Sequence, residues 1–306
     1  MKQKKVILLA GPTASGKSKL AIKLAQYFDG EIINADSMQV YKEISILTSK
    51  PLSKDRKIIK HHLYGINSVN RKFSTGQWLK LVIKKIKEQW ANKKIPIVVG
   101  GTGLYFKALT DGLVKIPNIS MQKRNQIRKL HKKVGQKKFF IKLSKLDPLA
   151  KKLISPSDKQ RSMRAYEVKK FTNKSLFEFR KETKSNFKYN VFKKIFINIP
   201  RESLSKKIEE RVEKMLNEGA INEVKKFSKI KVKKDLSANK IIGVKEIQDY
   251  LKGKTTLNRA SELIKQKTRQ YAKRQFTWAR GHMKSWNMIY SSDLDDLFRK
   301  AINKIS

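Results

Sequence analysis

Short apolar runs alternate with longer amphipathic segments in the first hundred residues. Runs rich in Val and Ile cover Val6–Ala10, Glu31–Asn34 and Ile95–Val99, and their length and β-branched composition are typical of buried strands. Between them, Lys17–Phe28 and Trp78–Trp90 carry apolar residues at helical spacing along one face. Strands and helices that alternate in this way predict a parallel sheet covered by helices on both faces.

The pattern changes in the middle of the chain. Between about residues 120 and 188 strand-like runs are absent, and the sequence becomes helical and very basic. A fourth strand-like run, Ile195–Ile199, follows this segment. We therefore interpret residues 119–189 as a helical insertion domain within a core domain made of residues 1–118 and 190–306.

The last third of the chain is again helical in pattern. From Arg201 to Ile302 we expect helices only, with Gly219 and Gly253 as helix stops. A segment that ends the chain in this way predicts a helical C-terminal region attached to the α/β core.

The charge of the chain is far from balanced. Its 306 residues contain 72 Lys and Arg against 25 Asp and Glu, a formal net charge of +47. Such an excess favours a strongly anionic partner such as nucleic acid, although a compositional bias that places lysines on solvated surfaces is the alternative. Cysteine is absent, which excludes disulfides, thiolate metal sites and a cysteine nucleophile.

Apolar runs long enough to cross a membrane are also absent, and the run after the N-terminal lysines is too short for a signal peptide. We expect a cytoplasmic protein with no membrane association.

The segment after the first strand fits the P-loop pattern G-x-x-x-x-G-K-[ST], between a strand and a helix. In such a loop the backbone N–H groups face an anion, the lysine supplies a point charge and the last hydroxyl ligates Mg²⁺. The motif leaves open whether the anion is a nucleoside triphosphate or another diphosphate. The predicted phosphate-binding residues are Gly11, Pro12, Thr13, Ala14, Ser15, Gly16, Lys17 and Ser18, with Ser18 as the metal ligand.

Two further strands end in chemically distinctive residues. A P-loop NTPase usually has an apolar strand that ends in a metal-binding Asp, but Ile95–Val99 runs into the segment Gly100-Gly101-Thr102-Gly103. The strand EIIN instead leads to Asp36 and Ser37, at the carboxyl edge where open α/β sheets bind ligands. Asp36 is therefore a candidate metal-shell residue or general base, and a helix N-cap is the alternative.

A long helix is predicted from Asn258 to His282. One stripe of it is apolar and is most simply interpreted as core, and nearly the opposite stripe is basic and is predicted to follow a phosphate backbone unless it is merely solvated. The apolar stripe is formed by Ala260, Ile264, Tyr271 and Trp278, and the basic stripe by Lys265, Arg269, Lys273 and Arg280.

A second arginine-rich site lies in the insertion. Arg161 and Arg164 are three residues apart on a predicted helix, where they could bind phosphate or instead pair with Asp158 and Glu167.

Taken in order, these motifs identify the chain as resembling the bacterial tRNA dimethylallyltransferases, nearly from end to end. The resemblance is carried by GPTASGKS, Asp36–Tyr41, Thr48–Pro51, His61–Leu63, Ile95–Leu109, Asp147-Pro148, Gln160–Val168, Ile241–Glu246 and Thr268–Arg280.

The resemblance implies a P-loop parallel sheet and a prenyl transfer. A dimethylallyl group would pass from dimethylallyl diphosphate to the exocyclic N6 of the adenosine adjacent to the anticodon (position 37), in tRNAs that read codons beginning with U. The P-loop would hold the prenyl diphosphate and Mg²⁺, Thr102 and Arg211 would steady the diphosphate oxygens, and Asp36 would take the proton from N6. The enzyme would be a monomer.

The tRNA anticodon arm would be the macromolecular partner, with the adenine flipped into a pocket. The expected tRNA contacts are Asp36, Ser37, Met38, Gln39, Thr102, Arg124, Gln160, Arg161, Ser162, Met163 and Arg164, joined by Arg269, Lys273 and Arg280.

The chain departs from the family pattern at four positions, Leu47, Tyr64, Val244 and Ala279. A small-molecule P-loop kinase, an adenine-nucleotide isopentenyltransferase and an RNA-binding module are the alternative functions. The kinase has no need of basic helices, the nucleotide enzyme has no need of a basic insertion, and the binding module leaves the P-loop and Asp36 unexplained.

Overall fold

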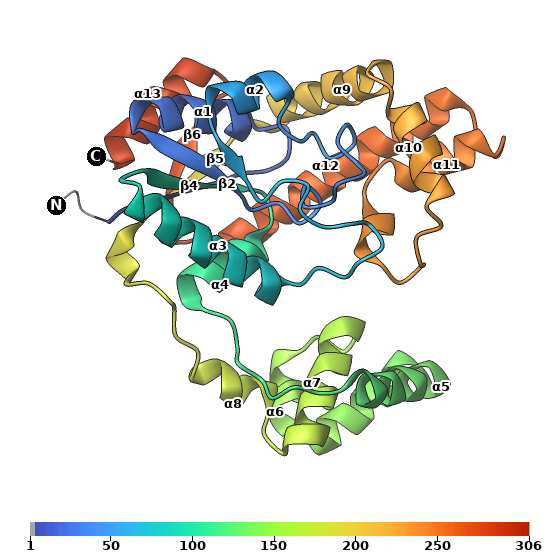
Figure 1. Cartoon of the computed structure of the whole chain (residues 1–306). Coiled ribbons are helices and arrows are strands. Elements are labelled where there is room, and N and C mark those ends of the chain that lie inside the picture. Colours follow the sequence, from blue (N-terminus) through green and yellow to red (C-terminus); the bar gives the residue numbers. More distant parts are fainter. Residues whose placement is uncertain (1–3, 306) are drawn as a thin grey trace. The chain divides into compact units, whose positions relative to one another are not determined.

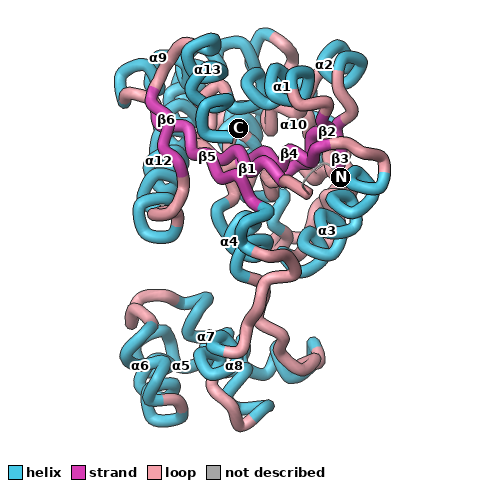
Figure 2. The backbone as a smooth tube through the Cα atoms, turned by 90° about the vertical axis from the view of Figure 1, so that its left-hand side faces the viewer, coloured by secondary structure: helices cyan, strands magenta, loops and turns pink. Residues whose placement is uncertain are grey.

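The computed structural model describes residues 4–305 and contains a six-stranded parallel sheet in the order β3-β2-β4-β1-β5-β6 (Figures 1 and 2). The strands are β1 (Val6–Ala10), β2 (Gly30–Asn34), β3 (His61–His62), β4 (Ile95–Gly100), β5 (Phe192–Asn198) and β6 (Asn287–Tyr290). The predicted fold class, a parallel sheet with flanking helices, is confirmed.

Helices make up most of the remaining chain. Those outside the insertion are α1 (Lys17–Tyr27), α2 (Ser53–Ile58), α3 (Thr75–Ala91), α4 (Gly103–Asp111), α9 (Arg201–Asn217), α10 (Ala220–Lys229), α11 (Val244–Leu251), α12 (Leu257–His282) and α13 (Leu294–Ile305), with short 3-10 turns at Tyr189–Val191 and Ser237–Lys240. As predicted, Gly219 and Gly253 follow the ends of α9 and α11, and both have positive φ.

Buried aliphatic side chains hold the helices on the sheet. On one face Ile7 and Leu9 of β1 pack with Leu20 and Leu24 of α1 and with Leu297 of α13, as their alternation along the strand requires. Figure 2 shows α1 and α13 on this face, with α3, α4 and α12 on the other. The sheet is thus covered on both sides, which leaves its carboxyl edge as the place for a site.

The four strands expected from the apolar runs are present, with ends displaced by at most three residues. The expectation of helices only between Arg201 and Ile302 is wrong, because β6 lies within that range. Both unpredicted strands, β3 and β6, are at the edges of the sheet and short, and β6 buries only Ile289. So little burial leaves no apolar run or alternation for a sequence pattern to display.

The chain divides into two compact units. One comprises the described chain up to Thr110 and from Phe187 onward, and the other is Asp111–Asn186. The second unit has its own small core, formed by Phe140, Leu143, Ala150, Ile154 and Ala165. Its helices are α5 (Met121–Leu146, interrupted at Gly135), α6 (Pro148–Leu153), α7 (Lys159–Thr172) and α8 (Leu176–Lys181).

Candidate active site

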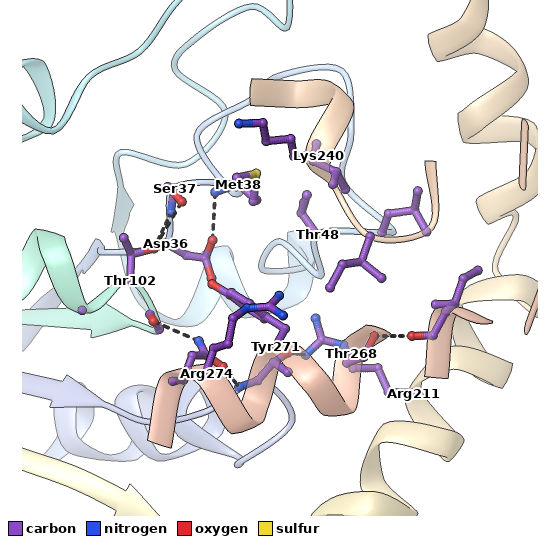
Figure 3. Close-up of a pocket in the computed structure, with 18 of the residues that line it drawn as sticks. Asp36, Ser37, Met38, Thr48, Thr102, Arg211, Lys240, Thr268, Tyr271 and Arg274 are labelled. Carbon is purple, nitrogen blue, oxygen red and sulfur yellow. Dashed lines mark hydrogen bonds between the residues drawn. The ribbon is translucent and has the colours of Figure 1, made fainter. Parts of the chain in front are cut away.

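A cavity of about 410 Å³ lies where three strand ends meet two helices of the first unit (Figure 3). The P-loop after β1 contributes Thr13, the segment after β2 contributes Asp36–Met38, and the segment after β4 contributes Gly101–Leu104. Helix α9 adds Arg211, and α12 forms one wall. This volume suits a small molecule.

The P-loop has the electrostatics of an anion site. Lys17 Nζ donates a hydrogen bond to the carbonyl of Pro12 at 2.9 Å. Burial lowers the pKa of the Lys17 ammonium to about 8, although Asp36 acts to raise it, and the nearby Arg211 lowers it further. The buried Ser15 hydroxyl has no hydrogen-bond partner. A bound diphosphate would supply both the negative charge and the acceptor that these groups lack.

Arg211 reaches the P-loop from α9. Its Nη1 donates to the Thr13 hydroxyl at 2.9 Å, across 198 residues of sequence. Burial lowers the pKa of this guanidinium and Asp36 opposes the shift, but an arginine stays protonated at any physiological pH. A second fixed cation therefore lies beside Thr13 of the P-loop.

Asp36 interacts electrostatically with both Lys17 and Arg211. Its Oδ1 accepts a hydrogen bond from the Met38 backbone N–H at 2.9 Å, which orients the carboxylate. Burial and, after it, the charge of Asp36 raise the pKa of the Tyr271 hydroxyl, so the phenol stays protonated close to the carboxylate. No helix begins at Asp36 in the described chain, since the next helix is α2, and the N-cap alternative is therefore wrong.

Thr102 links the segments after β2 and β4. Its hydroxyl accepts from the Ser37 backbone N–H at 3.0 Å and donates to the Ser37 hydroxyl at 3.3 Å. Its own N–H donates to the carbonyl of Ala35 at 3.2 Å, and the Tyr271 side chain reaches its hydroxyl. These bonds fix Thr102 beside Asp36.

Gln39 is placed differently from its neighbours. Asp36, Ser37 and Met38 line the cavity, but the Gln39 amide donates to the carbonyls of Thr48 and Ser49 at 2.8 and 2.9 Å. Gln39 is not among the lining residues, and its amide fastens the loop that carries the other three.

The predicted residues of the insertion share one helix, α7. Gln160 and Arg161 are exposed, Met163 and Arg164 are half-buried, and Ser162 is fully buried. Both arginines have acidic neighbours, since Arg161 pairs with Asp158 at 3.4 Å and Arg164 with Glu167 at 3.1 Å.

Arg124, on α5, has a buried Nε atom without a hydrogen-bond partner. Arg124 and the residues of α7 all belong to the second unit.

The basic stripe of α12 is partly neutralised by carboxylates of the first unit. Lys265 pairs with Glu213 and Glu262 at 3.2 and 3.1 Å, and Arg269 pairs with Glu209 at 3.3 Å. Lys273 and Arg280 are exposed. Together with Arg269 they line a second cavity of about 1010 Å³ on the opposite side of α12 from the first.

The opposite stripe of α12 is not simply core. Ala260 and Ile264 are buried as expected, but Tyr271 and Trp278 are half-buried and line the first cavity. Their interpretation as core residues is wrong, because this part of the helix lies against the strand-end loops instead of against another apolar surface.

Four polar residues that line the cavity were not predicted as site residues from the sequence: Lys240, Thr268, Arg274 and Gln275. For Gln275 a signal exists, since it falls between Tyr271 and Trp278 on one helical face and is the polar member of an otherwise aromatic stripe.

The four departures from the family pattern lie in packed regions. Leu47 and Val244 belong to one buried cluster, and a Cβ on Gly243 would lie 2.6 Å from Leu47 Cδ2. Burial raises the pKa of the Tyr64 hydroxyl, and Ala279 is 2% exposed. Leu47 also lines the first cavity, so this departure reaches the site itself.

Among residues 4–305 no helix is both long and apolar enough to cross a bilayer. The same residues contain no cluster of three or more His, Cys, Asp or Glu side chains suited to a metal ion.

Known proteins resemble this chain over nearly its whole length. Residues 39–282 match the model of the family described as IPP transferase. A tRNA dimethylallyltransferase of Pelagibacter ubique is 56% identical over 299 residues, which cover 98% of this chain and 96% of that protein.

Solved structures of two proteins also match this chain over nearly its whole length. The tRNA delta(2)-isopentenylpyrophosphate transferase of Staphylococcus epidermidis has a TM-score of 0.70 at 32% identity and covers 99% of each chain. A eukaryotic dimethylallyltransferase acting on tRNA has a TM-score of 0.84 at 30% identity, over 99% of this chain and 77% of that one. With a family model that matches most of its residues and relatives that match it end to end, the chain belongs to the IPP transferase family.

Proposed function

We propose that this protein is a tRNA dimethylallyltransferase, which transfers the dimethylallyl group of dimethylallyl diphosphate to N6 of the adenosine adjacent to the anticodon. The observation that carries the proposal is the convergence of an anion cradle and a carboxylate on one cavity, with Lys17 and Arg211 beside the phosphate position and Asp36 beside both. Relatives that carry this activity in their names support it.

The reaction requires one new bond and one broken bond. N6 of adenine attacks C1 of the prenyl group, the C1–O bond breaks, and the diphosphate leaves with the bonding electrons. Asp36 accepts the proton that N6 loses, while Lys17 and Arg211 stabilise the charge on the leaving oxygens. Thr102, which is hydrogen-bonded to Ser37, would orient the adenine and the prenyl diphosphate toward each other.

Mg²⁺ fits the oxygen chemistry of the P-loop. Ser18 presents an exposed hydroxyl in the first turn of α1, directly after Lys17. Mg²⁺ prefers hard oxygen ligands and takes few of them from the protein when phosphates are present. When bound it would offset diphosphate charge.

A stacked adenine cannot enter a cavity of this kind, so the target base must leave the anticodon loop. Asp36, Ser37 and Met38 line the cavity that would receive it. We propose that two groups of residues hold the anticodon arm, Arg124, Gln160, Arg161, Met163 and Arg164 of the insertion and Arg269, Lys273 and Arg280 of α12. We expect the enzyme to act as a cytoplasmic monomer on tRNAs that read codons beginning with U.

A P-loop kinase is the main alternative, and the end of β4 argues against it. That strand ends at Gly100 and leads into Thr102 and not into a metal-binding carboxylate. To test the proposal, the protein is incubated with Mg²⁺ and radiolabelled dimethylallyl diphosphate, and tRNA or AMP is supplied as acceptor. In a parallel reaction ATP replaces the prenyl diphosphate. Label in the tRNA alone supports the proposal. Label in AMP alone identifies a nucleotide prenyltransferase, and ATP hydrolysis without prenyl transfer identifies a kinase-like enzyme; either result overturns the proposal.

The exposed cations of α12 allow a prediction about tRNA binding. The double variant Lys273→Ala, Arg280→Ala should bind tRNA more weakly. The slope of the logarithm of the tRNA association constant against the logarithm of the salt concentration should flatten by up to about two, or roughly one for each lost phosphate contact. Lys265→Ala is the matched control, because this lysine already pairs with two carboxylates. A salt slope equal to that of the unmodified protein would show that the exposed pair faces only solvent.

A further inference from the structure

One face of α12 contacts three successive residues of the segment after β4. Tyr271 reaches the hydroxyl of Thr102, Gln275 one turn later bonds to Gly101, and Trp278 packs on Gly103. Residues separated by four and by three positions lie on the same side of a helix, so this contact surface follows from the sequence spacing. The helix therefore serves as a support for the loop that carries Thr102.

Gln275 also joins this loop to the P-loop. Its Oε1 accepts from the Thr13 backbone N–H at 2.9 Å, and its Nε2 donates to the Gly101 carbonyl at 2.9 Å. The side chain is buried, with 8% of its surface exposed. One amide thus bridges two loops that lie 262 and 174 residues away from it in the sequence.

The packing around the bridge leaves little room for another arrangement. A Cβ on Gly101 would lie 2.0 Å from Gln275 Nε2, and one on Gly103 would lie 2.1 Å from Trp278 Cδ1. Such distances are far inside van der Waals contact, so α12 touches the loop backbone directly. Both amide atoms are needed, because Thr13 presents a donor and Gly101 presents an acceptor.

We propose that Gln275 is a positioning residue for prenyl transfer, which sets the P-loop, with its diphosphate, at the correct distance from Thr102 and Asp36. The proposal rests on the prenyl transfer proposed above. It assigns to Gln275 no contact with either substrate. Because a displacement of about 1 Å between reacting groups can cost about 10²-fold in rate, loss of the bridge should lower kcat more than it raises KM for the prenyl diphosphate.

The variant Gln275→Glu provides the sharpest test. A neutral carboxylic acid can accept from Thr13 and donate to Gly101, as the amide does, but a carboxylate places an acceptor against the Gly101 carbonyl. Burial, the facing Gly101 carbonyl and the charge of Asp36 favour the neutral acid. The cations of Lys17, Arg211 and Arg274 favour the carboxylate. We expect burial to prevail, so the ratio of variant to wild-type kcat should rise by at least about tenfold as the pH falls from 8 to 6. Taking the ratio cancels any titration that the two proteins share.

Two further variants complete the design. Gln275→Leu removes both bonds and should lower kcat by about tenfold to 10²-fold at every pH. Asn258→Asp makes the same change from amide to acid at an exposed position of α12 that lines neither cavity, and its kcat ratio should stay flat with pH. Thermal melts of each variant record whether it folds.

If the wild-type enzyme catalyses prenyl transfer, two results would overturn the assignment of Gln275 as a positioning residue. One is a flat kcat ratio for Gln275→Glu, and the other is a Gln275→Leu enzyme within about twofold of wild type in kcat. If Gln275→Leu fails to fold, the pH dependence of the folded Gln275→Glu enzyme decides alone. A wild-type enzyme without prenyl transfer would instead contradict the proposed function.

Discussion

Replacing Asp36 with Asn should lower kcat for prenyl transfer by about 10²- to 10⁴-fold, the usual contribution of a general base, while the affinity for tRNA changes little. The amide oxygen can still accept from the Met38 N–H, so the loop keeps its shape. What is lost is the group that takes the N6 proton. Single-turnover rates and equilibrium binding of tRNA, measured on the same preparation, separate the two effects.

The matched control for Asp36 is Asp295→Asn, which removes a surface carboxylate whose side chain is 80% exposed on α13. That variant should retain full turnover. If tRNA affinity of the Asp36→Asn protein falls as far as its rate, Asp36 acts in binding and its assignment as the base is wrong.

Replacing Lys17 with Met should lower kcat/KM by about 10²- to 10³-fold, because a preorganised charge beside the leaving group is removed. The buried ammonium lies in the same loop as the unpaired Ser15 hydroxyl, and both groups can donate hydrogen bonds to an anion. Inorganic diphosphate should therefore bind the variant much more weakly than it binds the wild type, as isothermal calorimetry can measure.

Lys19→Met tests whether loss of any positive charge on α1 has the same effect. Lys19 is exposed in the first turn of the helix and should be replaceable without loss of diphosphate binding. Equal diphosphate affinity of the Lys17→Met and wild-type proteins would place the diphosphate elsewhere.

Local patterns were enough to predict the central strands and the loops that follow them. In β1, β2 and β4 most residues are buried, so continuous apolar runs mark these strands in the sequence. Because the strands are parallel, their carboxyl ends lie at one edge of the sheet. Lys17, Asp36 and Thr102 could therefore be placed at one edge from the sequence. The edge strands β3 and β6 could not, because two to four residues with little burial carry no pattern.

The part of the site contributed by α12 depends on tertiary packing. A helical projection gives the direction of Tyr271 and Gln275 but not the surface they meet, which the sheet edge supplies. The same projection omits Glu213 and Glu209, the partners of Lys265 and Arg269 on α9. Contacts between distant segments explain these errors. The other partner of Lys265, Glu262, lies three residues earlier on α12 and is visible in the sequence.

The central claim is that a prenyl diphosphate in the P-loop reacts with N6 of a tRNA adenine. Two anticodon-arm transcripts that differ only at the base next to the anticodon, adenosine in one and inosine in the other, are incubated with the protein, Mg²⁺ and dimethylallyl diphosphate. Nucleosides from each are then weighed by mass spectrometry. We predict a gain of one dimethylallyl unit on that adenosine and none on inosine, which lacks the N6 amine. No gain on adenosine, or an equal gain on inosine, would contradict the claim.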